Sequence, residues 1–151
     1  MSLESKSNWN IPEKISTEDL VKFLLKKRKI KNTEKFLNPF PEDIPSFEKL
    51  HGVQEAAKKI LEYVKSGKKI VIHGDYDSDG ICATSLLWNF LYRDLAKYLN
   101  TKVDVAPYIP SRIDQGYGLT ASSLNDVISL GARLLISVDC GVRDKELINE
   151  Y

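Results

Sequence analysis

A short apolar segment that runs directly into a cluster of acidic residues constrains the fold more than any other feature. Residues 69–73 (KIVIH) are rich in β-branched side chains and end before a glycine, which is typical of a buried strand. The next segment, 74–80 (GDYDSDG), places three aspartates at alternate positions. Residues 80–99 are apolar almost all round, as expected of a helix buried against a sheet. This order predicts a strand, an acidic loop and a buried helix.

The rest of the chain continues the alternation of strands and helices. Further strands are expected at 102–108 and 133–138, with a helix at 120–130 between them and another helix after Gly141. Before the first strand, apolar residues at helical spacing end at Ser66-Gly67, a natural helix stop. Alternating strands and helices predict an α/β fold, in which a parallel sheet has flanking helices and right-handed crossovers.

The first fifty residues follow a different pattern. Ser16 or Thr17 can cap a helix whose apolar stripe is formed by Leu20, Phe23 and Leu24. Residues 38–45 (NPFPEDIP) contain three prolines, which exclude a continuous helix there. We therefore expect a small helical lead-in with a proline-rich loop at 1–50, and the α/β domain at 51–151.

Composition excludes several classes of protein. With 22 Lys+Arg and 21 Asp+Glu the net charge is +1, which is too mild to indicate a nucleic-acid partner. The basic run at 26–31 is interpreted as the solvated end of a helix. The weakly charged stretch at 80–92 is too short to cross a bilayer, and the N-terminus lacks the pattern of a signal peptide, so a cytoplasmic protein is expected. Cys82 and Cys140 have no metal-binding spacing and are expected to be reduced and packed inside.

The acidic segment predicts a metal site. Asp75, Asp77 and Asp79 follow His73 at a strand end, and three ionised carboxylates this close are unfavourable unless a cation neutralises them. Oxygen ligands with at most one or two imidazoles suit Mg²⁺ or Mn²⁺. In the alternative interpretation one aspartate caps the following helix and the others face water, and this competes most seriously at Asp79.

Asp139 ends the third predicted strand, directly before Cys140 and Gly141. Because parallel strands present their carboxyl ends at one edge of a sheet, Asp139 is expected on the same edge as Asp77. A lone aspartate before a glycine usually belongs to a turn. Opposite an acidic triplet, however, it is more often a metal ligand.

The loop at 109–119 (IPSRIDQGYGL) carries candidate substrate-binding groups. The guanidinium of Arg112, next to Ser111, matches a phosphate, although Arg112 can equally pair with Asp114 on the surface. Tyr117, between two glycines, can stack on a base, and a buried ring with a bonded hydroxyl is equally compatible with the sequence.

Two classes of enzyme are disfavoured. Neither the dinucleotide-binding nor the P-loop glycine signature is present. The Asp75/Asp77 spacing fits haloacid-dehalogenase-type phosphatases, but that assignment leaves Asp139 and the segment at 109–112 (IPSR) unexplained.

Three segments in this order resemble the DHH phosphoesterase superfamily: VIHGDYDSDG (71–80), IPSRIDQGYGL (109–119) and VDCG (138–141). Within it the chain is similar to the N-terminal half of the catalytic domain of the single-strand-specific 5′→3′ DNA exonucleases, a likeness that extends upstream through FLNP and LHGVQEAAKKI. The Pro-Ser-Arg…Gly-Tyr-Gly loop distinguishes these exonucleases from the pyrophosphatases and short-oligonucleotide phosphodiesterases of the superfamily.

The resemblance implies a phosphodiesterase that uses Mn²⁺ or Mg²⁺ in a two-metal site and acts on single-stranded DNA in repair and recombination. His73, Asp77 and Asp79 would bind metal, Asp75 would bind metal or support a ligand, and Asp139 would bridge or complete the pair. Asp77, Asp79 and Asp139 would be the catalytic residues, and the substrate would contact Ser111, Arg112 and Tyr117.

The chain departs from the family pattern in one respect, because the Asp-His-His signature does not occur in it. We therefore expect a fragment of a longer enzyme that is nearly inactive alone, since its ligand set is incomplete. Two alternatives stay open: a phosphodiesterase of short oligonucleotides or cyclic dinucleotides, and an inactive relative that serves as a scaffold.

Overall fold

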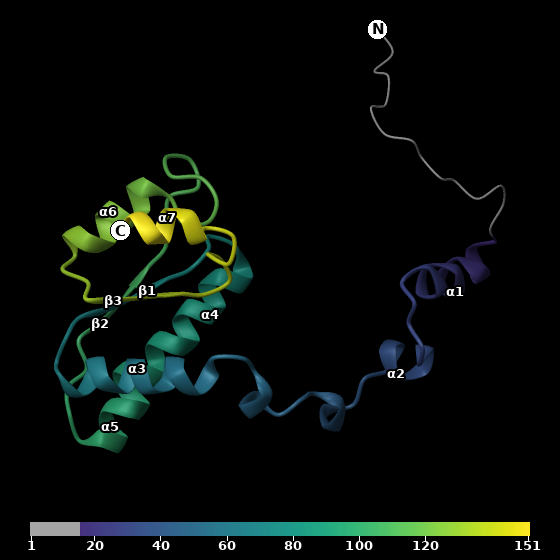
Figure 1. Ribbon diagram of the computed structural model, residues 1–151, viewed down its shortest axis with the longest axis horizontal. Helices are drawn as coiled ribbons and strands as arrows, with labels where there is room; N and C mark the ends of the chain where they lie inside the picture. The colour runs from purple at the N-terminus through teal and green to yellow at the C-terminus, as the bar shows by residue number, and fades with distance from the viewer. Residues whose placement is uncertain (1–15) are drawn as a thin grey trace, which may run out of the picture. The chain divides into compact units, whose positions relative to one another are not determined.

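The computed structural model describes residues 16–151 and divides the chain into two compact units, one ending at Lys49 and one spanning Leu50–Tyr151 (Figure 1). Predictions that concern residues 1–15 lie outside the described residues.

The first unit contains helices α1 (Thr17–Lys27) and α2 (Thr33–Leu37), followed by 3₁₀ turns at Pro41–Asp43 and Phe47–Lys49. The side-chain oxygen of Ser16 accepts a hydrogen bond from the backbone N–H of Asp19 at 3.2 Å, so the predicted cap of the first helix is confirmed at Ser16. The segment with three prolines forms a single 3₁₀ turn and no α-helix, as expected.

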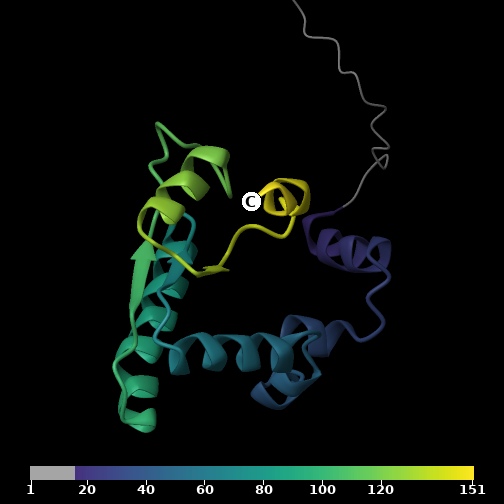
Figure 2. The same cartoon turned by 60° about the vertical axis from the view of Figure 1, so that its left-hand side comes forward.

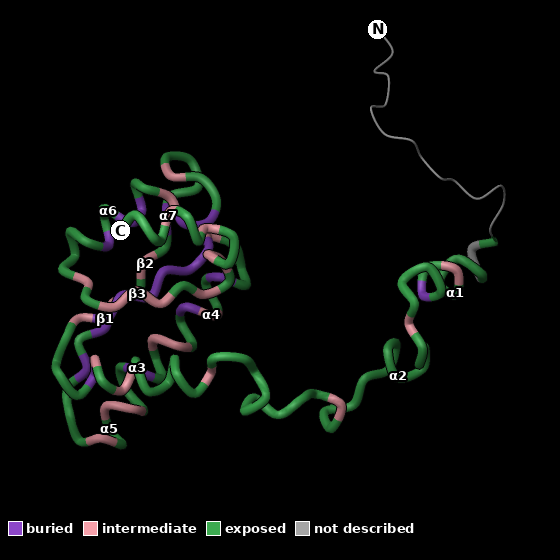
Figure 3. Tube along the Cα trace, viewed as in Figure 1, coloured by how far each residue is buried: buried purple, intermediate pink, exposed green. Residues whose placement is uncertain are grey.

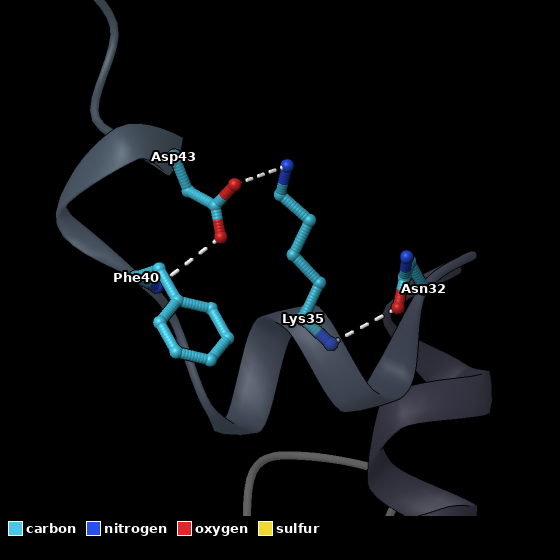
Figure 4. Close-up of polar contacts among 4 residues, drawn as sticks. All are labelled: Asn32, Lys35, Phe40 and Asp43. Atoms are coloured by element: carbon cyan, nitrogen blue, oxygen red, sulfur yellow. Dashed lines mark hydrogen bonds and ion pairs between the residues drawn. The ribbon is translucent and has the colours of Figure 1, made fainter.

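Lys35 connects α2 to the proline-rich segment (Figure 4). The Asn32 side chain accepts a hydrogen bond from the Lys35 backbone N–H at 3.0 Å and thereby caps α2. The Lys35 ammonium pairs with Asp43, which also accepts from the Phe40 backbone N–H at 3.2 Å. The contacts with Lys35 and Phe40 lower the pKa of Asp43. This pair is solvent-exposed on its Lys35 side and therefore adds little to stability.

The second unit confirms the predicted α/β fold. Its three strands, β1 (Ile70–His73), β2 (Val105–Tyr108) and β3 (Leu134–Ser137), form a parallel sheet in the order β2-β1-β3. In this register Ile70 lies opposite both Val105 and Leu134. The helices are α3 (Val53–Lys65), α4 (Ser78–Asn89), α5 (Ala96–Leu99), α6 (Ala121–Ser129) and α7 (Lys145–Glu150), and a π-helical segment, Phe90–Leu95, joins α4 to α5.

Helices cover β1 on both faces, which is why all four of its residues are buried (Figure 3). On one face α3 and the helix that begins with α4 pack on the sheet, while α6 lies across the other (Figures 1 and 2). The core on the first face is formed by Val64, Ile70, Ile72, Leu91, Val103 and Val105. The second face holds the buried pair His73 and Ser123.

The prediction of a helix buried against the sheet at 80–99 is confirmed, but only for one side of that helix. The helix exists, but its outer side is open, with Leu86 75% exposed and Tyr98 84% exposed. Cys82 also lies on the exposed side, contrary to the expectation that it is packed inside. The reason is geometric, since a sheet contacts only one side of a helix, and within the unit Leu50–Tyr151 no second layer covers the other side. Among the described residues, no helix is both long and apolar enough to span a bilayer.

Candidate metal centre

The strand order makes the sheet change its winding direction between β1 and β3. From β1 the chain crosses one face of the sheet to reach β2, and from β2 it crosses the other face, through α6, to reach β3 on the far side of β1. β1 leads to α4 on the first face, whereas β3 leads to α7, which lies beside α6 on the second face (Figure 1). Such a change of winding direction is where open α/β sheets bind their ligands.

Three carboxylates meet at the carboxyl ends of β1 and β3. Asp75 and Asp77 follow β1, Asp139 follows β3, and one oxygen of each lies within 4.8 Å of the others. Asp75 is only 2% exposed, whereas Asp77 and Asp139 are open to solvent. The structure thus brings Asp139 to Asp77 and Asp75 at a single edge of the sheet, as the pattern of parallel strands predicted.

The local backbone holds two of these aspartates in place. The Asp77 side chain caps α4, since its Oδ1 accepts from the backbone N–H groups of Asp79 and Gly80, both at 3.0 Å. Asp139 has a φ of +59°, a left-handed conformation that aspartate and asparagine tolerate better than most residues. A turn residue at this position can point its carboxylate back across the strand ends.

Gly80 allows α4 to begin close to the Asp75 backbone. A Cβ added at Gly80 would lie 2.4 Å from the carbonyl oxygen of Asp75 and 2.6 Å from its nitrogen, closer than real Cβ atoms come. The first turn of α4 and the acidic loop are therefore in direct backbone contact. Glycine is required for this approach rather than for a special φ angle, because Gly80 does not adopt a positive φ.

The cluster lacks a positive partner within the part of the chain that the structure describes, where none of the ion pairs includes Asp75, Asp77 or Asp139. Partial desolvation raises the pKa of Asp139, and the charges of Asp77, Asp79 and Asp75 raise it further. A divalent cation between these carboxylates would remove the repulsion. The donors are hard carboxylate oxygens, the type that Mg²⁺ and Mn²⁺ prefer, so the residues present fit such an ion.

Asp79 and His73 lie outside this group of three. Asp79 is in the first turn of α4, and the cap that the sequence analysis considered for it belongs to Asp77 instead. His73 is fully buried, with Nε2 3.1 Å from Ser123 Oγ and Nδ1 3.6 Å from Cys140 Sγ. Burial lowers the pKa of His73 and raises that of the Cys140 thiol to about 11, so both stay neutral at physiological pH. Their roles as metal ligands (His73 and Asp79) stay predictions.

The loop at 109–119 lies at the rim of the cluster. The Arg112 guanidinium is 5.3 Å from the ring centroid of Tyr76, the residue between Asp75 and Asp77. None of the ion pairs among the described residues includes Arg112, and the Asp114 carboxylate accepts the Ser111 hydroxyl at 2.6 Å. Tyr117 is 69% exposed, so the alternative interpretation, in which its ring is buried, is wrong.

Tyr76 was missed by the sequence analysis, although its position between two candidate ligands marked it for attention. Its ring lies edge-on to that of Tyr117, with centroids 6.5 Å apart. Next to this pair a groove of about 660 Å³ runs along the turn after β3, and its lining includes Tyr117, Asp139 and Arg143. The groove places the exposed ring of Tyr117 and the Arg143 side chain beside Asp139.

Comparison with known proteins assigns the class to which this arrangement belongs. The profile of the DHH family, N-terminal domain, matches residues 69–151, more than half of the chain. The chain therefore belongs to the DHH family.

The similar proteins within that family are single-stranded-DNA-specific exonucleases named RecJ. The chain is 32% identical to RecJ of Bacillus subtilis, in a match that covers 93% of this chain and 19% of that protein. It is 36% identical to RecJ of Thermus thermophilus, in a match that covers 67% of this chain and 14% of that protein. A crystal structure of exonuclease RecJ bound to manganese matches with a TM-score of 0.56 and 34% identity, covering 71% of this chain and 25% of that one. The chain spans about a fifth or less of these two curated relatives.

Proposed function

We propose that this chain supplies part of the active site of a divalent-metal-dependent 5′→3′ exonuclease of single-stranded DNA. The observation that carries the proposal is the group formed by Asp75, Asp77 and Asp139 at the point where the sheet changes its winding direction. The names of the similar proteins support DNA as the substrate, and the manganese in the similar crystal structure supports Mn²⁺ as the metal. A cytoplasmic role in repair and recombination belongs to this proposal.

The residues divide into ligands and substrate contacts. Asp75, Asp77 and Asp139 would hold Mn²⁺ or Mg²⁺, and His73 and Asp79 would complete a site for two ions after local rearrangement. When bound, such ions activate water and stabilise the charge that develops on the phosphate. The chain's own aspartates fix where that charge is neutralised, and Asp77 does so from the rigid start of α4.

Substrate contacts would come from the loop at 109–119. Arg112 presents a planar fork of N–H donors that suits a phosphate group, and Ser111 offers a hydroxyl beside it. Tyr117 exposes a ring on which a base can stack without regard to its identity. Contacts to phosphates and to base faces read no sequence, so the activity should be largely sequence-independent.

Mn²⁺ should stabilise the chain. We expect Mn²⁺ to raise the midpoint of thermal unfolding and EDTA to reverse the shift, because an ion that binds only the folded state contributes about 2.7 kcal/mol at a hundredfold excess over its Kd. Differential scanning calorimetry with Mn²⁺, Mg²⁺ and EDTA measures the effect. The Asp139→Asn variant should lose most of the shift. The Asp104→Asn variant should keep it, because Asp104 lies at the amino ends of the strands, away from the cluster. An equal shift in all three proteins would argue against the cluster as the binding site.

The choice of substrate tests the proposed function directly. A full-length protein that carries this chain should degrade long 5′-phosphorylated single-stranded DNA with Mn²⁺ and act at least about tenfold more slowly on dinucleotides, because only a long strand uses the phosphate and base contacts together. Rates on the two substrates, measured side by side, decide the matter. A preference for dinucleotides would favour the short-oligonucleotide phosphodiesterases, and no activity on either would favour an inactive scaffold.

A further inference from the structure

The loop that carries the proposed substrate contacts is closed on itself by Gln115. The backbone N–H of Gln115 donates to the carbonyl oxygen of Ser111 at 2.9 Å. In the opposite direction the Ser111 N–H donates to Oε1 of the Gln115 side chain, also at 2.9 Å. Gln115 therefore closes the turn that contains Arg112 by two hydrogen bonds.

The other end of the same side chain fixes this turn to the fold. Nε2 of Gln115 donates to the Tyr108 hydroxyl oxygen and to Oδ2 of Asp126, both at 2.8 Å. Tyr108 is the last residue of β2, and Asp126 lies on α6. Gln115 thus connects the loop to a strand of the sheet and to the helix that packs on it.

Tyr108 and Asp126 are in turn joined to each other. The Tyr108 hydroxyl donates to Oδ2 of Asp126 at 2.8 Å, so that one carboxylate oxygen accepts two hydrogen bonds. Burial and the bond to Asp126 raise the pKa of Tyr108, and the phenol therefore stays protonated and able to donate at neutral pH. Tyr108, Gln115 and Asp126 are called the brace below.

The brace acts on residues that lie beside the carboxylate cluster. Arg112 is within the turn that Gln115 closes, and its guanidinium lies 5.3 Å from the ring centroid of Tyr76. In the sequence, Tyr76 stands between two aspartates of the cluster, Asp75 and Asp77. Tyr117 follows Gln115 by two residues and approaches the same ring. At its far end the loop is held again, because the Leu119 N–H donates to Asp144 at 3.2 Å.

We propose that Gln115 is a positioning residue for the substrate, which holds Arg112 and Tyr117 beside the carboxylate cluster through its bonds to Tyr108 and Asp126. The inference rests on the proposed function and adds to it a group that touches neither metal nor DNA. Because the brace orders a substrate contact and leaves the carboxylates in place, its loss weakens binding of substrate and transition state alike. Such a change raises KM and leaves kcat nearly unaltered.

The test compares Gln115→Ala with Gln54→Ala in a full-length protein that carries this chain, assayed with Mn²⁺ on 5′-phosphorylated single-stranded DNA. Gln54 lies exposed on α3 and provides a matched control. We expect Gln115→Ala to raise KM about tenfold with less than about a twofold change in kcat, and Gln54→Ala to change neither. Asp126→Ala should reproduce the defect, and the double variant should be no worse than either single variant, because both break one network. Additive losses, or a fall in kcat with KM unchanged, would overturn the proposal.

Amide hydrogen exchange in the same proteins provides a readout that does not depend on activity. The Ser111 N–H donates to Oε1 of Gln115, so its exchange should accelerate at least about tenfold in Gln115→Ala. The amides of β1 should keep their wild-type rates. Faster exchange throughout β1 would indicate general destabilisation and overturn the positioning role. A wild-type protein that cuts no DNA overturns the proposed function and with it the substrate role of Gln115, whereas the Ser111 amide still reports whether the brace exists.

Discussion

Asp77→Asn is expected to reduce Mn²⁺-dependent degradation of single-stranded DNA by about 10³-fold or more, equivalent to about 4 kcal/mol of transition-state free energy. Asparagine removes the negative charge that the proposed metal site requires. It keeps a side-chain oxygen that can cap α4 as Asp77 does, by accepting from the N–H groups of Asp79 and Gly80. The measurement is the initial rate on 5′-phosphorylated single-stranded DNA in a full-length protein that carries this chain.

The cap makes asparagine a better probe than alanine, which would remove charge and cap together. The midpoint of thermal unfolding without metal should therefore change by only about 2 °C or less. Asp104→Asn is the control, because Asp104 directly precedes β2 at the other edge of the sheet and pairs only loosely with Lys69, at 4.0 Å. Activity of Asp77→Asn within tenfold of the wild type would contradict the proposed role of Asp77.

Gly80→Ala is expected to lower the free energy of unfolding by about 2–3 kcal/mol. On helix propensity alone the exchange should stabilise a helical position by about 1 kcal/mol. At Gly80, however, the new Cβ would lie 2.4 Å from the Asp75 carbonyl oxygen. The α4 backbone fixes the position of the Cβ, and the oxygen itself belongs to the backbone, so neither atom has much freedom to move. Equilibrium unfolding in urea measures the difference.

The direction of the stability change in Gly80→Ala distinguishes the two effects, because steric overlap lowers the free energy of unfolding and helix propensity raises it. Ser85→Ala in the same helix is the control, since Ser85 is exposed and its replacement should leave stability within about 0.5 kcal/mol. Gly80→Ala should also weaken Mn²⁺ binding. The clash of the new Cβ with the Asp75 backbone is relieved only when α4 and the acidic loop move apart, and this movement displaces the proposed ligand Asp75. Unchanged or increased stability in Gly80→Ala would show that α4 does not begin against the acidic loop.

Local sequence signals predicted the individual elements well. The β-branched segment at 69–73 forms β1 over Ile70–His73, and the stop at Ser66-Gly67 ends α3 at Lys65. The strand expected at 102–108 is shorter and begins at Val105. Proximity of Asp139 to Asp77 followed from a general rule for parallel strands, which holds here because both strands end at the same edge.

What the sequence did not reveal depends on contacts between distant residues. The order β2-β1-β3, which sets the change of winding direction between β1 and β3, has no signal in any single segment. The partner of His73 is Ser123, fifty residues away, so the buried surroundings of this candidate ligand could not be predicted from the sequence. The exposed side of α4 was missed because hydrophobicity shows that residues can be buried and not which layer covers them.

Asp77 and Gln115 illustrate the same limit at the site itself. An aspartate before a helix and one at its first turn look alike in sequence, and only the hydrogen bonds to Asp77 identify it as the cap. Gln115 resembles an ordinary loop residue until Tyr108 and Asp126 are placed beside it. Side-chain roles that depend on two or more elements required the structure.

The central claim is that turns after two different strands form one metal site, and Mn²⁺ titration followed by the electron paramagnetic resonance of the free ion tests it most directly. Wild-type chain, Asp77→Asn and Asp139→Asn should be compared at one protein concentration. Asparagine tolerates the φ of +59° at position 139, so both variants should fold. The account predicts that each single variant weakens Mn²⁺ binding at least about tenfold, as expected when one ion needs ligands from both turns. Wild-type affinity in Asp139→Asn, with binding lost only in Asp77→Asn, would contradict it.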